Sequence, residues 1–130
     1  MKISVAKNAG FCFGVKRAVS LAEKMLEEKN HICIMGNIIN NPRIVLGFEK
    51  KGARTISSLS EVCSGETLVI RSHGVKKEIL EEAQSRGIEC IDATCHFVKK
   101  IHKIVSENDA ANEFLLIAGS VNHPEVMGIR

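Results

Sequence analysis

The chain has 130 residues, 45% hydrophobic and 25% charged, a composition typical of a globular chain with one modest core. Its 18 basic and 15 acidic residues give a formal net charge of +3, with the two signs mixed along the chain. This mixing argues against a nucleic-acid partner and fits a small anionic ligand. No apolar run approaches the roughly 20 residues of a membrane span, so we expect a cytoplasmic protein with no membrane partner.

Short apolar runs alternate with amphipathic helical stretches nearly from end to end. Strands are expected at residues 3–6, 32–35, 54–56, 67–70, 88–91 and 114–118. Helices are expected at residues 15–26, 42–51 and 76–86, then from Phe97 to Val105, and again from Pro124. Such alternation predicts an α/β fold, a parallel sheet flanked by helices.

Two polar connections and one boundary complete the expected layout. Residues 57–65 and 107–113 are expected to be connections without a strand. Near Cys95 one set of strand–helix units is complete and another begins. We therefore expect residues 1–95 to form a first α/β lobe and residues 96–130 to begin a second, truncated one.

Five cysteines are an odd number, and thiols in a cytoplasmic protein are usually kept reduced, so a disulfide framework is not expected. The sequence contains no CxxC pair, and hence no signature of a zinc ribbon or a thioredoxin. Any metal site would have to gather ligands that are distant in sequence.

Four side chains lie in connections between an expected strand and the expected helix that follows it: Cys12, His73, Cys95 and His123. Open α/β sheets bind their ligands at this edge. A helix N-terminus favours the thiolate form of a cysteine, which binds metal, and its unpaired N–H groups can hold a phosphate. The four positions therefore suit both a metal and an anion.

Each position also has a simpler interpretation. Cys12 could be a small buried hydrophobe between two phenylalanines, and Cys95 a residue in a helix-capping turn. The two histidines could be capping or surface residues. Glu125 could simply be a first-turn helix residue favoured by the helix dipole. The remaining cysteines are interpreted as structural: Cys33, Cys63 and Cys90.

Four segments carry a resemblance to a known family. They are GFCFGV (residues 10–15), SHGV (72–75), DATC (92–95) and NHPEVMG (122–128). In order and spacing they are similar to those of the 4-hydroxy-3-methylbut-2-enyl diphosphate reductases, iron-sulfur enzymes of the non-mevalonate isoprenoid pathway. The resemblance covers the whole chain and implies the first lobe, and the start of the second, of a three-lobed α/β enzyme.

The resemblance implies a role for each matching residue. Cys12 and Cys95 would be two of three thiolates that hold a 4Fe-4S cluster with one iron open to the substrate hydroxyl. His73 and His123 would hydrogen-bond the substrate diphosphate. Glu125 would deliver a proton during the reductive dehydroxylation that yields isopentenyl and dimethylallyl diphosphates. A ferredoxin or flavodoxin would supply the electrons one at a time.

The chain departs from the family pattern at two positions. Where the family usually has a histidine in a GxxxHN segment, this chain has Asn40, which can donate a hydrogen bond to the substrate but cannot carry positive charge. The proline that commonly follows the second cluster cysteine is here His96.

The family's third cluster cysteine has no counterpart in these residues, and none of the three other cysteines matches its position. We therefore expect an N-terminal portion of a longer enzyme, with little or no activity alone. Two other hypotheses stay open. One is a metal-binding or structural α/β module holding zinc or no metal, which would be colourless, and the other is a phosphate-binding regulatory domain.

Overall fold

The computed structural model describes residues 1–7, 9–29, 31–110 and 114–130. Its centre is a parallel sheet of four strands in the order β2-β1-β3-β4. They are β1 (Ile32–Met35), β2 (Arg54–Ile56), β3 (Thr67–Ile70) and β4 (Cys90–Asp92). All pairings are parallel, so the carboxyl ends of the strands meet at one edge of the sheet. The predicted α/β fold is confirmed.

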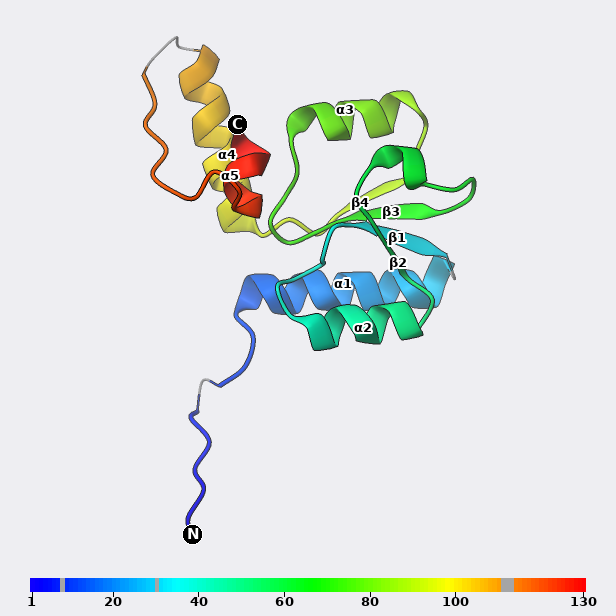
Figure 1. The fold of residues 1–130 in the computed structure, drawn as a ribbon, viewed down its shortest axis with the longest axis vertical. Coiled ribbons are helices and arrows are strands. Elements are labelled where there is room, and N and C mark those ends of the chain that lie inside the picture. Colours follow the sequence, from blue (N-terminus) through cyan, green and yellow to red (C-terminus); the bar gives the residue numbers. More distant parts are fainter. Residues whose placement is uncertain (8, 30, 111–113) are drawn as a thin grey trace.

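Helices cover both faces of the sheet. Helix α1 (Phe13–Lys29) and helix α2 (Pro42–Lys50) lie against one face, and α3 (Lys77–Ser85) lies against the other (Figure 1). Side chains alternate along each strand, so β1 sends Ile32 and Ile34 to the α1 side and Cys33 and Met35 to the α3 side. Because both faces are covered, β1 and β3 are apolar at almost every position and buried throughout.

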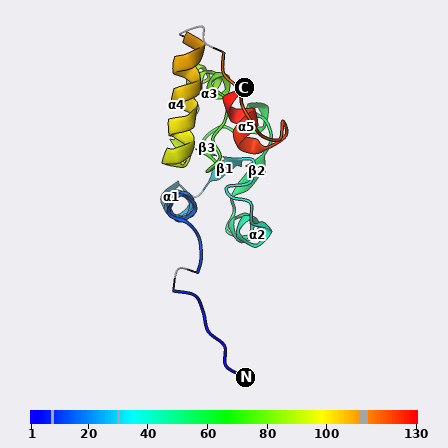
Figure 2. The ribbon, with the colours of Figure 1, turned by 90° about the vertical axis from the view of Figure 1, so that its left-hand side faces the viewer.

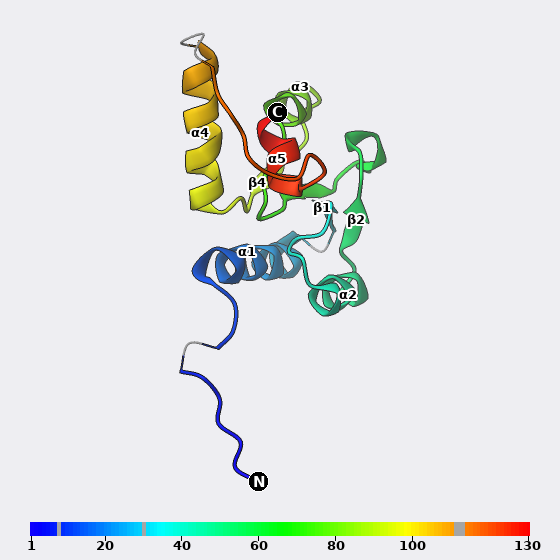
Figure 3. The same ribbon diagram turned by 60° about the vertical axis from the view of Figure 1, so that its left-hand side comes forward.

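Two further helices lie together beyond the carboxyl edge of the sheet. Helix α4 (His96–Ala110) begins just after β4, and the short α5 (Pro124–Ile129) packs against it (Figure 3). Figure 2 shows α5 lying beside α4 on the sheet side. Helix α4 leaves several apolar side chains exposed: Phe97, Ile101 and Ile104.

Two predicted strands are wrong. Residues 3–6 form no strand, and the segment before α1 runs away from the sheet, with Ile3 and Val5 exposed (Figures 1 and 2). Residues 114–118 also form no strand and are mostly exposed. The reason is the same in both places: an apolar or alternating run forms a strand only when a partner strand lies beside it, and neither segment has one among the described residues.

The other expected elements are present with small shifts. The expected strand at residues 88–91 is β4, displaced to Cys90–Asp92, and residues 57–65 contain a 3₁₀ turn, Leu59–Glu61. Residues 107–110 belong to α4, so this part of the predicted connection is wrong, and residues 111–113 lie outside the described residues. No described helix has the length and apolar character required to cross a membrane.

Candidate functional site

The loops that follow β1, β3 and β4 are hydrogen-bonded to one another at the carboxyl edge of the sheet. The Ser72 N–H donates to the Ile38 carbonyl at 3.1 Å, and the Cys95 N–H donates to the Ser72 carbonyl at 2.9 Å. These bonds continue the pairing of the strands beyond the sheet itself. They place His73 and Cys95, predicted as site residues, on neighbouring loops.

The turn that carries Cys95 packs against the first turn of α1. A Cβ atom placed on Gly14 would lie 2.5 Å from the Cys95 Sγ, far inside van der Waals contact. Arg17, one turn later, donates from Nη1 to the Thr94 carbonyl at 3.3 Å. Because Gly14 lies two residues after Cys12, these contacts bring the two predicted cluster cysteines to one place.

Both cysteines directly precede a helix, as predicted. The Cys12 carbonyl accepts the N–H of Lys16, and the Cys95 carbonyl accepts the N–H of Lys99, each at 2.9 Å. Cys12 is exposed and Cys95 is half-buried. The simpler interpretation of Cys12 as a buried hydrophobe is therefore wrong. Cys12 follows no strand, however, because the predicted strand before it is absent.

His73 lies in the loop after β3, half-buried, and its Nδ1 has no hydrogen-bond partner in the described part of the chain. Burial lowers the pKa of His73, and the positive charge of Arg71 lowers it further. The charge of Glu125 opposes this shift and His123 adds to it. The three predicted substrate and proton-transfer residues therefore share one electrostatic environment.

His123 and Glu125 sit at the start of α5. The Glu125 N–H donates to the His123 Nδ1 at 3.3 Å, so His123 is the N-cap of the helix. In the neutral ring this leaves the proton on Nε2, free to donate to a ligand. Two of the simpler interpretations are confirmed: His123 caps α5, and Glu125 lies in its first turn.

A cavity of about 360 Å³ opens between α4 and α5 beside these two residues. Both His123 and Glu125 line it. The rest of its wall is mainly apolar and comes from α4, α5 and the segment before α5: Val98, Ile101, Ile117, Ala118, Val126 and Ile129. Its size and its few polar groups are those of a site for a small, partly apolar ligand.

Asn40 is an exposed residue of the loop between β1 and α2. Its neighbour Asn41 is the N-cap of α2, since its Oδ1 accepts the N–H groups of Arg43 and Ile44 at 3.1 and 3.4 Å. Asn41 is therefore occupied by the helix, whereas the side chain of Asn40 is exposed.

The other three cysteines lie away from this place. Cys33 in β1 is fully buried, and burial raises its pKa to about 11. Cys90 in β4 is half-buried, and burial also raises its pKa. Cys63 is exposed in the loop after β2, where Arg54 donates to its Sγ at 3.0 Å. These positions agree with a structural interpretation of all three.

Asp92 stabilises the DATC turn. From the sequence it is interpreted only as a possible helix cap. Its Oδ1 accepts the Thr94 N–H at 2.9 Å, and its Oδ2 pairs with the Lys99 Nζ at 2.6 Å. Burial raises the pKa of Asp92, but the bonds from Lys99 and Thr94 outweigh burial and lower it. Asp92 thus ties β4 to α4 on both sides of Cys95.

Within the described residues, no three His, Cys, Asp or Glu side chains gather closely enough to hold a metal ion by themselves. What the structure does provide is two cysteines on elements that contact each other. The absent side chain of Gly14, two residues after Cys12, leaves room for the Cys95 sulfur. This pair fits a partial ligand set for a thiolate-bound cluster, with further ligands supplied from elsewhere.

Comparison with known proteins bears on this arrangement. Residues 3–130 match the family described as LytB protein. The chain belongs to the LytB family. A relative from Clostridioides difficile (strain 630), named 4-hydroxy-3-methylbut-2-enyl diphosphate reductase, is 42% identical over 130 residues, which cover 99% of this chain and 47% of that protein. A relative of the same name from Geobacter metallireducens is 43% identical, covering 99% and 45%.

Solved LytB-type structures share the fold. A structure described as (E)-4-hydroxy-3-methyl-but-2-enyl diphosphate reductase, the terminal enzyme of the non-mevalonate pathway, is 42% identical with a TM-score of 0.81, covering 98% of this chain and 45% of that one. The Plasmodium falciparum E-1-hydroxy-2-methyl-but-2-enyl-4-diphosphate reductase is 34% identical with a TM-score of 0.90, covering 95% and 39%. The chain spans about half the length, or less, of these relatives.

Proposed function

We propose that this chain provides part of the active site of a reductase that removes the hydroxyl group of 4-hydroxy-3-methylbut-2-enyl diphosphate to give isopentenyl and dimethylallyl diphosphates. The observation that carries the proposal is the contact of Gly14 with Cys95, because Gly14 lies two residues after Cys12 and Cys95 is hydrogen-bonded to Ser72, the neighbour of His73. Membership of a family whose relatives are named for this reaction supports it. The cytoplasm, where thiols stay reduced, would be its location.

Cys12 and Cys95 would hold a 4Fe-4S cluster together with a ligand from outside the described residues. Such a cluster, when bound, supplies electrons and a Lewis-acidic iron for the substrate hydroxyl. A ferredoxin or flavodoxin would deliver those electrons. The chain's own part is to place each cysteine directly before a helix, where its carbonyl accepts the first helical N–H group.

The diphosphate would be bound by His73 and His123. His123 presents its Nε2 proton because its Nδ1 is already occupied by the Glu125 N–H. His73 is kept neutral by burial and by the charge of Arg71, and a bound anion would reverse that balance. We therefore propose that diphosphate binding is accompanied by proton uptake at His73. Asn40 would donate a neutral hydrogen bond from the β1 loop.

Glu125 would give a proton to the departing hydroxyl. It lines the cavity between α4 and α5, whose apolar wall would take the five-carbon chain and exclude water from it. Glu125 thus lines the cavity and is also close enough to His73 to affect the pKa of that ring.

The substrate part of the proposal can be tested by NMR titration of the histidine resonances. We expect dimethylallyl diphosphate to shift the ring signals of His73 and His123 while the exposed His31, at the opposite edge of the sheet, stays unchanged. Dimethylallyl alcohol, which lacks the diphosphate, is the control and should shift neither ring. Equal responses of all three histidines, or none, would contradict the proposal.

A further inference from the structure

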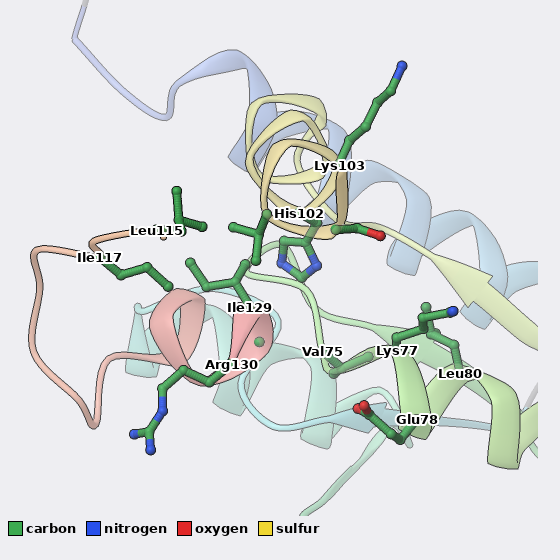
Figure 4. Close-up of a pocket in the computed structure, with 13 residues that line it drawn as sticks. Val75, Lys77, Glu78, Leu80, His102, Lys103, Leu115, Ile117, Ile129 and Arg130 are labelled. Atoms are coloured by element: carbon green, nitrogen blue, oxygen red, sulfur yellow. The ribbon is translucent and has the colours of Figure 1, made fainter. Parts of the chain in front are cut away.

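His102 is a half-buried histidine on α4 that has no role in the site described so far. Figure 4 shows its ring pointing from α4 toward α5, between Ile129 and Val75. Its Nε2 is buried and has no hydrogen-bond partner within the described ranges. A buried ring nitrogen without a hydrogen-bond partner costs desolvation free energy, so the position of the ring requires a physical explanation.

The ring of His102 lies between two glycines from different parts of the chain. A Cβ atom on Gly74 would lie 3.2 Å from both Cε1 and Nε2 of the ring. A Cβ atom on Gly128 would lie 3.3 and 3.4 Å from the same two atoms. All four distances are shorter than most contacts of a real Cβ atom, so each glycine allows the ring to approach the backbone closely.

The two glycine backbones also come close to each other. The Cβ position of Gly128 lies 3.8 Å from the carbonyl carbon of Gly74. Gly74 has a φ of +75°, which a turn requires, but Gly128 lies within α5, where glycine is a poor helix former. Its presence there is explained by the close packing of α5, the turn and the ring.

This junction joins the two halves of the candidate anion site. Gly74 directly follows His73, and Gly128 lies three residues after Glu125 on the helix that His123 caps. We propose that His102 is a positioning residue, whose ring fixes the distance between the His73 turn and the start of α5. The inference rests on the proposed function, because it concerns how that function's diphosphate site is assembled.

The ring acts through its shape and not through a charge. Burial lowers the pKa of His102, and the charges of Asp92 and Glu125 only partly oppose that effect, so the ring is neutral near pH 7. A neutral ring held by contacts on two sides is rigid, and a rigid spacer is what a two-part binding site needs.

The test uses the 130-residue chain, inorganic pyrophosphate as the probe, and the variants His102→Ala, Gly128→Ala and their combination. Two quantities are measured: the pyrophosphate dissociation constant, and the nuclear Overhauser contact between the α protons of Gly74 and Gly128. Melting temperature reports whether each variant folds, and His31→Ala, at an exposed position on the opposite edge, is the control.

We expect His102→Ala to bind pyrophosphate about tenfold more weakly and to lose the Gly74–Gly128 contact, because the two parts of the site are then no longer held at a fixed distance before binding. Gly128→Ala should weaken binding too, although alanine is the better helix former. Added to His102→Ala, it should cause no further loss, because the ring that the new methyl group would meet is gone.

The two proposals fail in different ways. If the unaltered chain binds no pyrophosphate, the proposed function is contradicted, and the Gly74–Gly128 contact still decides the role of His102. If His102→Ala keeps that contact and full affinity, or if Gly128→Ala weakens binding equally with and without the ring, His102 is not a positioning residue. Should His102→Ala fail to fold, Gly128→Ala alone decides: unchanged affinity would overturn the inference.

Discussion

Gly14 sits against the Cys95 sulfur at the point where α1 meets the DATC turn, with 2.5 Å between the sulfur and the position of an added Cβ. Gly14→Ala is expected to displace Cys95 and to reduce the free energy of unfolding by about 1–3 kcal/mol, as overpacking does. Urea denaturation measures this loss. A short bifunctional thiol reagent should also cross-link Cys12 to Cys95 less readily in the variant.

Gly47 is the matched control for that substitution. It also lies within a helix, α2, but an added Cβ there would meet no atom within 4 Å. Gly47→Ala should therefore stabilise the chain by about 0.5–1 kcal/mol through helix propensity alone. If both substitutions stabilise the chain equally, the close approach of Gly14 to Cys95 is wrong.

The cysteines should differ in their reactivity toward alkylating reagents. Cys33 is fully buried with a pKa of about 11, whereas Cys12 and Cys63 are exposed. At pH 8 we expect iodoacetamide to label Cys12 and Cys63 first and Cys33 last, because the thiolate is the reacting form. Peptide mass spectrometry over time gives the order. Early labelling of Cys33 in the folded chain would contradict its burial.

At the scale of elements, Asp92 links β4 to α4 through Thr94 and Lys99. Asp92→Asn should cost about 1 kcal/mol at pH 7, a modest value because the pair with Lys99 is partly exposed and screened by solvent. The pKa of Asp92 is lowered, so its contribution is present above the ordinary carboxyl pKa and is lost as the pH falls through the folded value.

Denaturation of the unaltered chain and of Asp92→Asn at pH 7 and at pH 3 checks this assignment. The difference between the two should shrink at the lower pH. An equal difference at both values would show that the carboxylate charge has no part in holding the turn.

The correctly predicted elements are those whose two ends are also marked in the sequence, by a proline, a glycine or a polar loop. Pro42 begins α2 and Gly52 follows its end, while β1 and β3 are apolar runs between polar loops. The strands predicted at residues 3–6 and 114–118 had the same apolar character but no partner strand in the described ranges. Whether a neighbouring strand is present depends on the assembled sheet, and a local sequence pattern does not carry this information.

The candidate site could be located from the sequence only in part. The sequence places His73 and Cys95 on neighbouring loops because both follow strands that the structure contains, and parallel strands bring such loops to one edge. Cys12 is placed instead by the packing of α1 on the DATC turn, and His123 by the packing of α5 on α4. Gly14 and His102 gave only a weak signal, a glycine in a helix and a lone histidine, because their contacts are long-range.

Across the whole molecule, two half-buried histidines make stability depend on pH. Burial lowers the pKa of both His73 and His102, so the unfolded chain takes up protons first as the pH falls. The free energy of unfolding should therefore decrease as the pH drops below the ordinary histidine value of about 6.5. Denaturant midpoints at pH 7, 6 and 5 measure this decrease, and His73→Asn should reduce it. A flat profile would contradict the burial of these rings.

The most direct test of the central claim, that Cys12 and Cys95 together hold an iron-sulfur cluster, is anaerobic reconstitution followed by iron and sulfide analysis and a visible spectrum. The comparison is between the unaltered chain, the Cys12→Ser, Cys95→Ser double variant, and a Cys63→Ser control. With the remaining ligand supplied by the small thiol present during reconstitution, we expect a brown chain whose iron, sulfide and visible absorption are lost in the double variant and kept in the control. A colourless unaltered chain, or equal iron and sulfide in all three proteins, would contradict it.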